Sequence, residues 1–265
     1  MTKPNAYDQI ISRVFNAHYR RGDERVDFSR EELAEAARKL RISVPKNLGD
    51  VVYTYRYRRE LPSQIKSGAP TGKQWVIMPA GIAKYSFWAT SFTTIEPNHQ
   101  LAETKVPDAT PGLIARYALS DEQALLARVR YNRLLDIFTG VACYSLQNHL
   151  RTTVTGIGQI ETDEIYVGVD RFGAQYVFPV QAKGGNDKLS VVQIAQDFEM
   201  AANKFPSLTA RPVAAQFLDS NLIVLFELER PGIEVRVRRE EHYRLVSPEE
   251  IADSDLAIYR SRVAS

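Results

Sequence analysis

The feature that most constrains the fold is a strand–turn–strand pattern running from Glu161 to Lys183. Apolar residues alternate along its two halves, a period of two that predicts β-strands: Ile165, Val167 and Val169, then Tyr176, Phe178 and Val180. The intervening Arg171-Phe172-Gly173 fits a three-residue hairpin loop with Gly173 in the left-handed conformation. The pattern therefore predicts an antiparallel hairpin.

The short loop also sets the register of the hairpin. Its geometry places Asp163 opposite Gln181, and Glu161 opposite Lys183. Opposed side chains point to the same side of a sheet, with Cβ atoms roughly 4.5–5.5 Å apart. We therefore expect one cluster in which oxygen ligands for a hard cation lie beside an ammonium group. This combination suits metal-assisted attack of water on a phosphodiester. The alternative is a surface hairpin with an ordinary salt bridge.

Asp163, followed across the hairpin by Gln181-Ala182-Lys183, resembles the active site of the PD-(D/E)xK nucleases. The most similar members are those with Gln in place of the second acid, such as Mrr-like restriction endonucleases. Thr162 stands where these enzymes usually have proline. The resemblance covers residues 113–265 and implies a mixed sheet flanked by helices.

The resemblance also implies roles for individual residues. Asp163, Gln181 and the carbonyl group of Ala182 would bind Mg²⁺, for which Mn²⁺ is an expected substitute. Lys183 would orient and help deprotonate the attacking water, and Glu161 would hold a second metal ion or a metal-bound water. The substrate would be double-stranded DNA, and its cleavage on both strands implies a homodimer. Gln193 becomes a candidate contact to substrate or water.

The sequence around the hairpin predicts a core in the order helix, strand, strand, strand, helix, strand, strand. A long helix is expected from Ser120 to Gly140, with Asp121 and Glu122 in its first turn. The other expected elements are strands over 144–154, 212–218 and 222–227, a helix over 190–204, a charged edge strand over 234–240 and a terminal helix from Ser247.

Two residues of the strand before the hairpin are candidates for the catalytic end of the sheet. Arg151 is a candidate phosphate contact. His149 has two interpretations, a proton shuttle or a hydrogen-bonded structural residue.

The N-terminal part has a different pattern. Helices are expected over 7–20, after the capping box Ser29-Arg-Glu-Glu32, and over 46–59; strands follow over 74–78 and 84–88. This order is typical of a winged helix, whose third helix enters the major groove of DNA. Its expected outward residues are Lys46, Asn47, Asp50, Thr54, Tyr57 and Arg58, and its buried ones Leu48, Val51, Val52 and Tyr55. The alternative is a helical module for dimerisation or domain docking.

Charge divides along the chain in the same way. Residues 1–92 carry 16 Lys and Arg against 9 Asp and Glu, whereas the remainder carries 18 against 23. A basic N-terminal part suits a polyanionic partner. We expect a DNA-recognition domain over 1–92, a proline-containing linker over 93–112 and a nuclease domain over 113–265.

Composition limits the remaining possibilities. With 44% hydrophobic residues the chain is expected to fold, and no apolar run approaches the ~20 residues that span a bilayer. The single cysteine, Cys143, cannot form an internal disulfide and is expected to pack in the core. The N-terminus has no apolar signal core, so we expect a cytoplasmic protein without a membrane partner.

Together these features predict an α/β (α+β) protein: a winged helix followed by a restriction-endonuclease-like domain. The expected function is a metal-dependent, restriction-type DNA endonuclease, whose target can be a modified sequence. Two alternatives remain open: a DNA-binding regulator with an inactive nuclease-like domain, and a repair nuclease that reads DNA structure.

Overall fold

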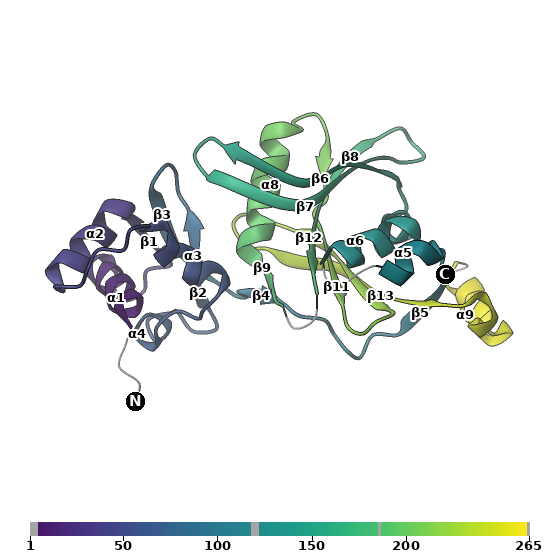
Figure 1. Cartoon of the computed structure of the whole chain (residues 1–265), viewed down its shortest axis with the longest axis horizontal. Helices are drawn as coiled ribbons and strands as arrows, with labels where there is room; N and C mark the ends of the chain where they lie inside the picture. Colours follow the sequence, from purple (N-terminus) through teal and green to yellow (C-terminus); the bar gives the residue numbers. More distant parts are fainter. Residues whose placement is uncertain (1–4, 118–121, 185–186, 264–265) are drawn as a thin grey trace. The chain divides into compact units, whose positions relative to one another are not determined.

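The computed structural model describes residues 5–117, 122–184 and 187–263, and it is a mixed α/β protein with one large mixed sheet (Figure 1). The chain divides into two units. The first comprises residues 1–94, 152–160 and 190–196, and the second comprises residues 95–151, 161–189 and 197–265. The predicted residues Ser120 and Asp121 lie outside the described ranges.

The first unit contains helices and a small antiparallel sheet. The helices are α1 (Ala6–His18), α2 (Arg30–Lys39), α3 (Gly49–Tyr57) and α4 (Ser63–Lys66). The strands are β1 (Arg25–Ser29), β2 (Gln74–Pro79) and β3 (Lys84–Thr90), in the order β1-β3-β2. Ser29 caps α2 through the predicted capping box with Glu32. A predominantly apolar core from these helices and the sheet holds the unit together.

Strand β1 is absent from the sequence-based prediction. It has only two buried residues, Val26 and Phe28, because the other side chains face outward. A five-residue segment with two apolar positions gives little periodic signal. Its partner β3 determines its conformation, with Val26 opposite Phe87 and Phe28 opposite Tyr85. Long-range pairing therefore creates this strand.

The large sheet belongs mainly to the second unit. Its described strands run in the order β5 (Glu103–Pro107), β13 (Arg236–Val246), β12 (Leu222–Glu229), β11 (Val213–Phe217), β8 (Gln175–Lys183), β7 (Gly158–Val169) and β6 (Ala142–Val154), and β10 (Thr209–Ala210) also pairs with β8. Strand β11 is parallel to β8 and antiparallel to β12. Strand β12 is buried along nearly its whole length, as its apolar sequence predicts.

Helices cover both faces of this sheet. Alternate residues of β8, Phe178, Val180 and Ala182, pack in one core with α6 (Glu122–Tyr131) and α7 (Leu134–Thr139). Gln181 points to the opposite face, where it contacts Asp197 of α8 (Val191–Lys204). Cys143 lies in the α6–α7 core as expected, and burial raises the pKa of its thiol to about 11.

The prediction of one long helix up to Gly140 is wrong, because the chain breaks between α6 and α7. Arg133 adopts a left-handed conformation with φ of 50°. The preceding Asn132 is buried, and its side chain accepts a hydrogen bond from the amide of Ala109 and donates one to Thr110. These bonds tie the interhelical turn to the segment after β5. A short helix, α5 (Gly112–Tyr117), also precedes α6.

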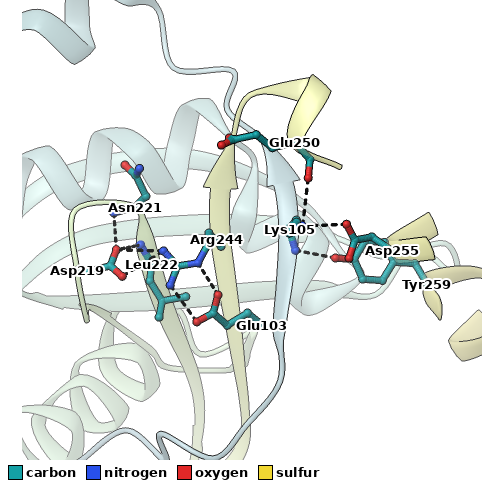
Figure 2. A network of polar contacts seen from close by, with 9 residues as sticks. All are labelled: Glu103, Lys105, Asp219, Asn221, Leu222, Arg244, Glu250, Asp255 and Tyr259. Atoms are coloured by element: carbon teal, nitrogen blue, oxygen red, sulfur yellow. Dashed lines mark hydrogen bonds and ion pairs between the residues drawn. The ribbon is translucent and has the colours of Figure 1, made fainter. Parts of the chain in front are cut away.

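The charged strand predicted over residues 234–240 extends further than expected, as β13, and its charged first half is exposed. Strand β5, which lies within the expected linker, pairs in parallel with residues 242–246 of β13. Figure 2 shows why this strand is held: the Arg244 guanidinium binds both carboxylate oxygens of Glu103, and its Nη1 lies 3.1 Å from Asp219 Oδ2. Lys105 Nζ donates to Asp255 of the terminal helix α9 (Asp253–Val263) at 2.9 Å.

The predicted hairpin is confirmed. Residues 164–169 pair with residues 180–175 in the expected register, with Glu164 opposite Val180 and Val169 opposite Gln175. Gly173 has φ of 84°, as the loop requires, and its amide donates to the Asp170 carbonyl.

Gly168 gives a test of packing behind the hairpin. A Cβ atom there would lie 2.7 Å from Val141 Cγ1 and 3.1 Å from the Ala142 carbonyl oxygen. We expect Gly168→Ala to lower the free energy of unfolding by about 1–3 kcal/mol, because the core must shift to admit the methyl group. Urea unfolding followed by circular dichroism measures this loss. Gly112→Ala is the control, since a methyl group on Gly112 would have no atom within 4 Å; equal midpoints for both variants would contradict the prediction.

Candidate active site

Asp163 of β7 and Lys183 of β8 come together at the open end of the hairpin. Asp163 Oδ2 accepts a hydrogen bond of 2.8 Å from the amide of Ala182. The hairpin register brings the middle of β7 beside the C-terminal end of β8, and this bond fixes the carboxylate against the second strand. The site therefore has a carboxylate with a defined orientation, close enough to the Lys183 ammonium for that charge to act on the pKa of Asp163.

The pKa of Asp163 reflects its burial and the charged groups around it. Burial raises the pKa of Asp163, and the nearby carboxylates of Glu122 and Glu161 raise it further. The Ala182 amide and the Lys183 ammonium act in the opposite direction. Two neighbouring carboxylates destabilise the charged form of this partly buried group. A cation that binds beside it would stabilise that charged form.

Lys183 forms its ion pair with Glu122, and not with Glu161, which was predicted to lie opposite it. Its Nζ lies 2.8 Å from Oε1 of Glu122, the first described residue of α6. The Lys183 side chain is 15% exposed and that of Glu122 is 39% exposed. The sequence indicates only that Glu122 lies at the start of a helix, because residue spacing does not show that α6 begins beside the end of β8.

Gln181 faces away from the expected metal site. Its Nε2 donates to the Asp197 carboxylate at 3.0 Å and to the carbonyl of Glu161 at 3.2 Å. Thr162 donates to the same carboxylate at 2.6 Å. Thr162, rather than Asp163, therefore lies on the side of Gln181, and the single predicted cluster divides into two.

The physical cause of this division is the burial of Asp197. Its side chain is completely buried, and burial raises its pKa to about 7. A buried carboxyl group requires hydrogen-bond donors, and Gln181 and Thr162 supply them. The sequence gives no signal for the burial of Asp197. A single acidic residue is common in an amphipathic helix, and its spacing does not show that it faces the sheet.

Glu161 belongs to an exposed group on β6 and β7. Its Oε1 lies 3.1 Å from His149 Nε2 and 3.1 Å from Arg151 Nη2. His149 has φ of 53°, an uncommon conformation for a residue within a strand. Its side chain is half exposed, and both interpretations of His149 stay predictions. Arg151 is exposed and is linked to the candidate site through Glu161.

A second buried carboxylate, Glu164, is also absent from the predicted site. It is fully buried, and its Oε1 accepts from Arg130 Nη2 at 2.7 Å and from Ser145 Oγ at 2.5 Å. The sequence signal for this site is a charged residue within a largely apolar strand. A charged residue that is buried requires a partner. Arg130 is that partner, and the pair ties α6 to β7.

The predicted DNA-contacting residues lie in several places. On and before α3, Lys46, Asn47, Asp50 and Arg58 are exposed, and Thr54 and Tyr57 are partly exposed. Val51, Val52 and Tyr55 are buried as predicted, and Leu48 packs against the same core. Tyr57 donates to Gln196 Oε1 at 3.2 Å within the first unit. Gln193 is partly exposed in the first turn of α8.

Two general observations bear on the class of protein. Within the described ranges, no set of three or more His, Cys, Asp or Glu side chains gathers as a ready metal site. Among the helices that the structure describes, none combines the length and apolarity needed to cross a bilayer. Comparisons with known protein families, with curated proteins and with solved structures found no match.

Proposed function

We propose that this protein is a metal-dependent endonuclease that hydrolyses phosphodiester bonds in double-stranded DNA. The observation that carries the proposal is the meeting of Asp163 and Lys183 at the end of a hairpin, beside the Glu122 carboxylate. Together with the flanking helices and the order of β6, β7 and β8, this arrangement supports a PD-(D/E)xK-type domain.

The donor set partly fits a magnesium or manganese ion. Asp163 and the Ala182 carbonyl would hold the ion, and the crowding of Asp163 by Glu122 and Glu161 favours a cation there. Gln181 does not fit as a ligand in its observed position, because its amide nitrogen binds Asp197. When bound, Mg²⁺ would supply Lewis-acid activation of the phosphate and of a water molecule.

The remaining steps fall to side chains of the chain. Lys183 carries a proton at Nζ and offsets negative charge that develops on the phosphate oxygens. Glu122 orients Lys183 through its 2.8 Å contact. Gln181 keeps the end of β8 in place by binding the Glu161 carbonyl and Asp197 at once. Arg151, on the exposed part of β6, contacts a neighbouring phosphate.

DNA recognition is assigned to the first unit, which we propose to be a winged helix. Its helices, its three-stranded antiparallel sheet and the basic excess of residues 1–92 support this assignment. Helix α3 buries one side, and the exposed residues on and beside it include Asn47, Asp50 and Arg58, types that contact bases and phosphates. Cleavage of both strands further implies that two copies act together in the cytoplasm.

Two observations favour a second candidate function. Gln181 is directed away from Asp163, and Lys183 is paired with Glu122. Both features suit a DNA-binding regulator whose nuclease-like domain no longer cuts. The presence of both Asp163 and Lys183 at the end of the hairpin favours the enzyme.

The test is an assay of the whole protein on supercoiled and linear duplex DNA, both unmodified and methylated, with flapped and branched duplexes in parallel. We expect cleavage with Mg²⁺ or Mn²⁺ and none with EDTA. Retarded migration of the duplex without cleavage in any metal would support the regulator instead. Cleavage restricted to flapped or branched substrates would support a structure-reading repair nuclease.

A further inference from the structure

Arg56 of α3 has a largely buried guanidinium without a carboxylate partner. Its Nε donates to the Ile77 carbonyl of β2 at 2.8 Å, and its Nη2 is buried without a hydrogen-bond partner. Its guanidinium lies 5.4 Å from the ring centroid of Tyr85 on β3. Burial lowers the pKa of Arg56, as expected for a cation removed from water.

A second guanidinium lies on the same tyrosine. Arg30 is the first residue of α2, and its Nη2 lies 3.4 Å from Tyr85 Oη. The same nitrogen lies against Gly49, the first residue of α3, since a methyl group there would be 3.4 Å from it. Tyr85 is therefore flanked by the exposed Arg30 and the largely buried Arg56, next to the N-terminus of the nine-residue α3.

This arrangement concentrates positive charge without neutralising it. In the part of the chain that the structure describes, neither arginine has a carboxylate within salt-bridge distance. A buried ion without a partner destabilises the folded state, and a well-placed oxyanion offsets this effect. Guanidinium groups match the geometry of phosphate oxygens, and the amide end of α3 adds a partial positive charge.

We propose that Arg30, Tyr85 and Arg56 form a binding site for one oxyanion, a backbone phosphate of the bound DNA. The exposed Arg30 contacts the phosphate directly, the buried Tyr85 holds the Arg30 guanidinium through its hydroxyl, and Arg56 supplies buried charge behind the tyrosine ring. This site fixes the position of α3 on the duplex without reading bases. The inference rests on the DNA-binding half of the proposed function.

The test measures DNA affinity of the full chain in EDTA as a function of salt. Arg30→Ala should weaken binding of a duplex about tenfold and reduce the slope of log K against log salt by about one, because one phosphate contact is lost. Tyr85→Phe keeps the ring and should weaken binding by a smaller factor. Arg38→Ala is the matched control: it removes an exposed arginine of the same helix whose Nε contacts only the Ala34 carbonyl, and should leave the slope unchanged.

A second arm uses inorganic phosphate alone, with nuclear magnetic resonance of arginine Nε groups as the readout. Wild-type binding with an unchanged slope in Arg30→Ala would overturn the site and leave the proposed function standing. An equal decrease of the salt-dependence slope in Arg38→Ala would also overturn the site, because the loss of any exposed arginine would then have the same effect on DNA binding. If duplex DNA fails to bind but phosphate shifts the Arg30 resonance, the anion site holds and the DNA-binding proposal fails.

Discussion

Lys183→Ala is expected to reduce DNA cleavage by about 10²–10³-fold while leaving the fold intact. The ammonium lies next to Asp163, and in the proposed mechanism it offsets the charge that develops on the phosphate. Its ion pair with Glu122 is partly exposed, so its removal costs little stability. Measurement of nicking and linearisation rates of plasmid DNA at saturating Mg²⁺ gives the effect directly.

Lys188→Ala is the matched control for this experiment. Lys188 also forms an ion pair, 3.0 Å from Glu96, but both side chains are about two-thirds exposed. The control should cleave at the wild-type rate. Asp163→Ala should lose cleavage to the same degree as Lys183→Ala, because both act on the same phosphate. A rate within twofold of wild type for either site variant would show that cleavage occurs elsewhere.

The hairpin was predictable because its information is local. Alternating apolar residues and the Gly173 loop specify two strands and their register, and the observed pairs follow it from Val169 back to Glu164. The buried side of α3 was predictable for the same reason, since Val51, Val52 and Tyr55 recur at helical spacing.

The partners of the charged side chains were not predictable in this way. Lys183 binds Glu122, which is 61 residues away, and Gln181 binds Asp197 on a helix that follows the hairpin. Such pairs depend on where whole helices lie against the sheet. A register predicts which side chains are opposite each other, but a buried carboxylate on a neighbouring helix decides which way an amide turns.

The same reasoning explains two features of the fold that the sequence-based prediction lacks. The break at Arg133 depends on a buried Asn132 that binds a loop more than twenty residues earlier. The second half of β13, residues 242–246, lies inside the sheet because β5 pairs with it in parallel, a contact that joins distant segments. Neither contact leaves a periodic pattern in the local sequence.

Asp197→Asn is expected to stabilise the protein at high pH and not at low pH. The folded-state pKa is about 7, above the ordinary value near 3.9 in an unfolded chain. Below pH 4 both states hold the proton, and the carboxyl group costs no ionisation. As pH rises from 4 to 7 only the folded state keeps the proton, so stability falls by about 1.4 kcal/mol per pH unit.

Asparagine removes this penalty because it has the same shape and does not ionise. Relative to wild type, the variant should gain on the order of 3 kcal/mol between pH 5 and pH 8. Urea unfolding must be followed by circular dichroism, since both tryptophans, Trp75 and Trp88, lie in the first unit whereas Asp197 lies in the second. Asp253→Asn, which changes an exposed carboxylate of α9, should show no such trend. A difference between Asp197→Asn and wild type that stays constant with pH would mean that this buried carboxyl group is already ionised, and that Gln181 and Thr162 stabilise its charge fully.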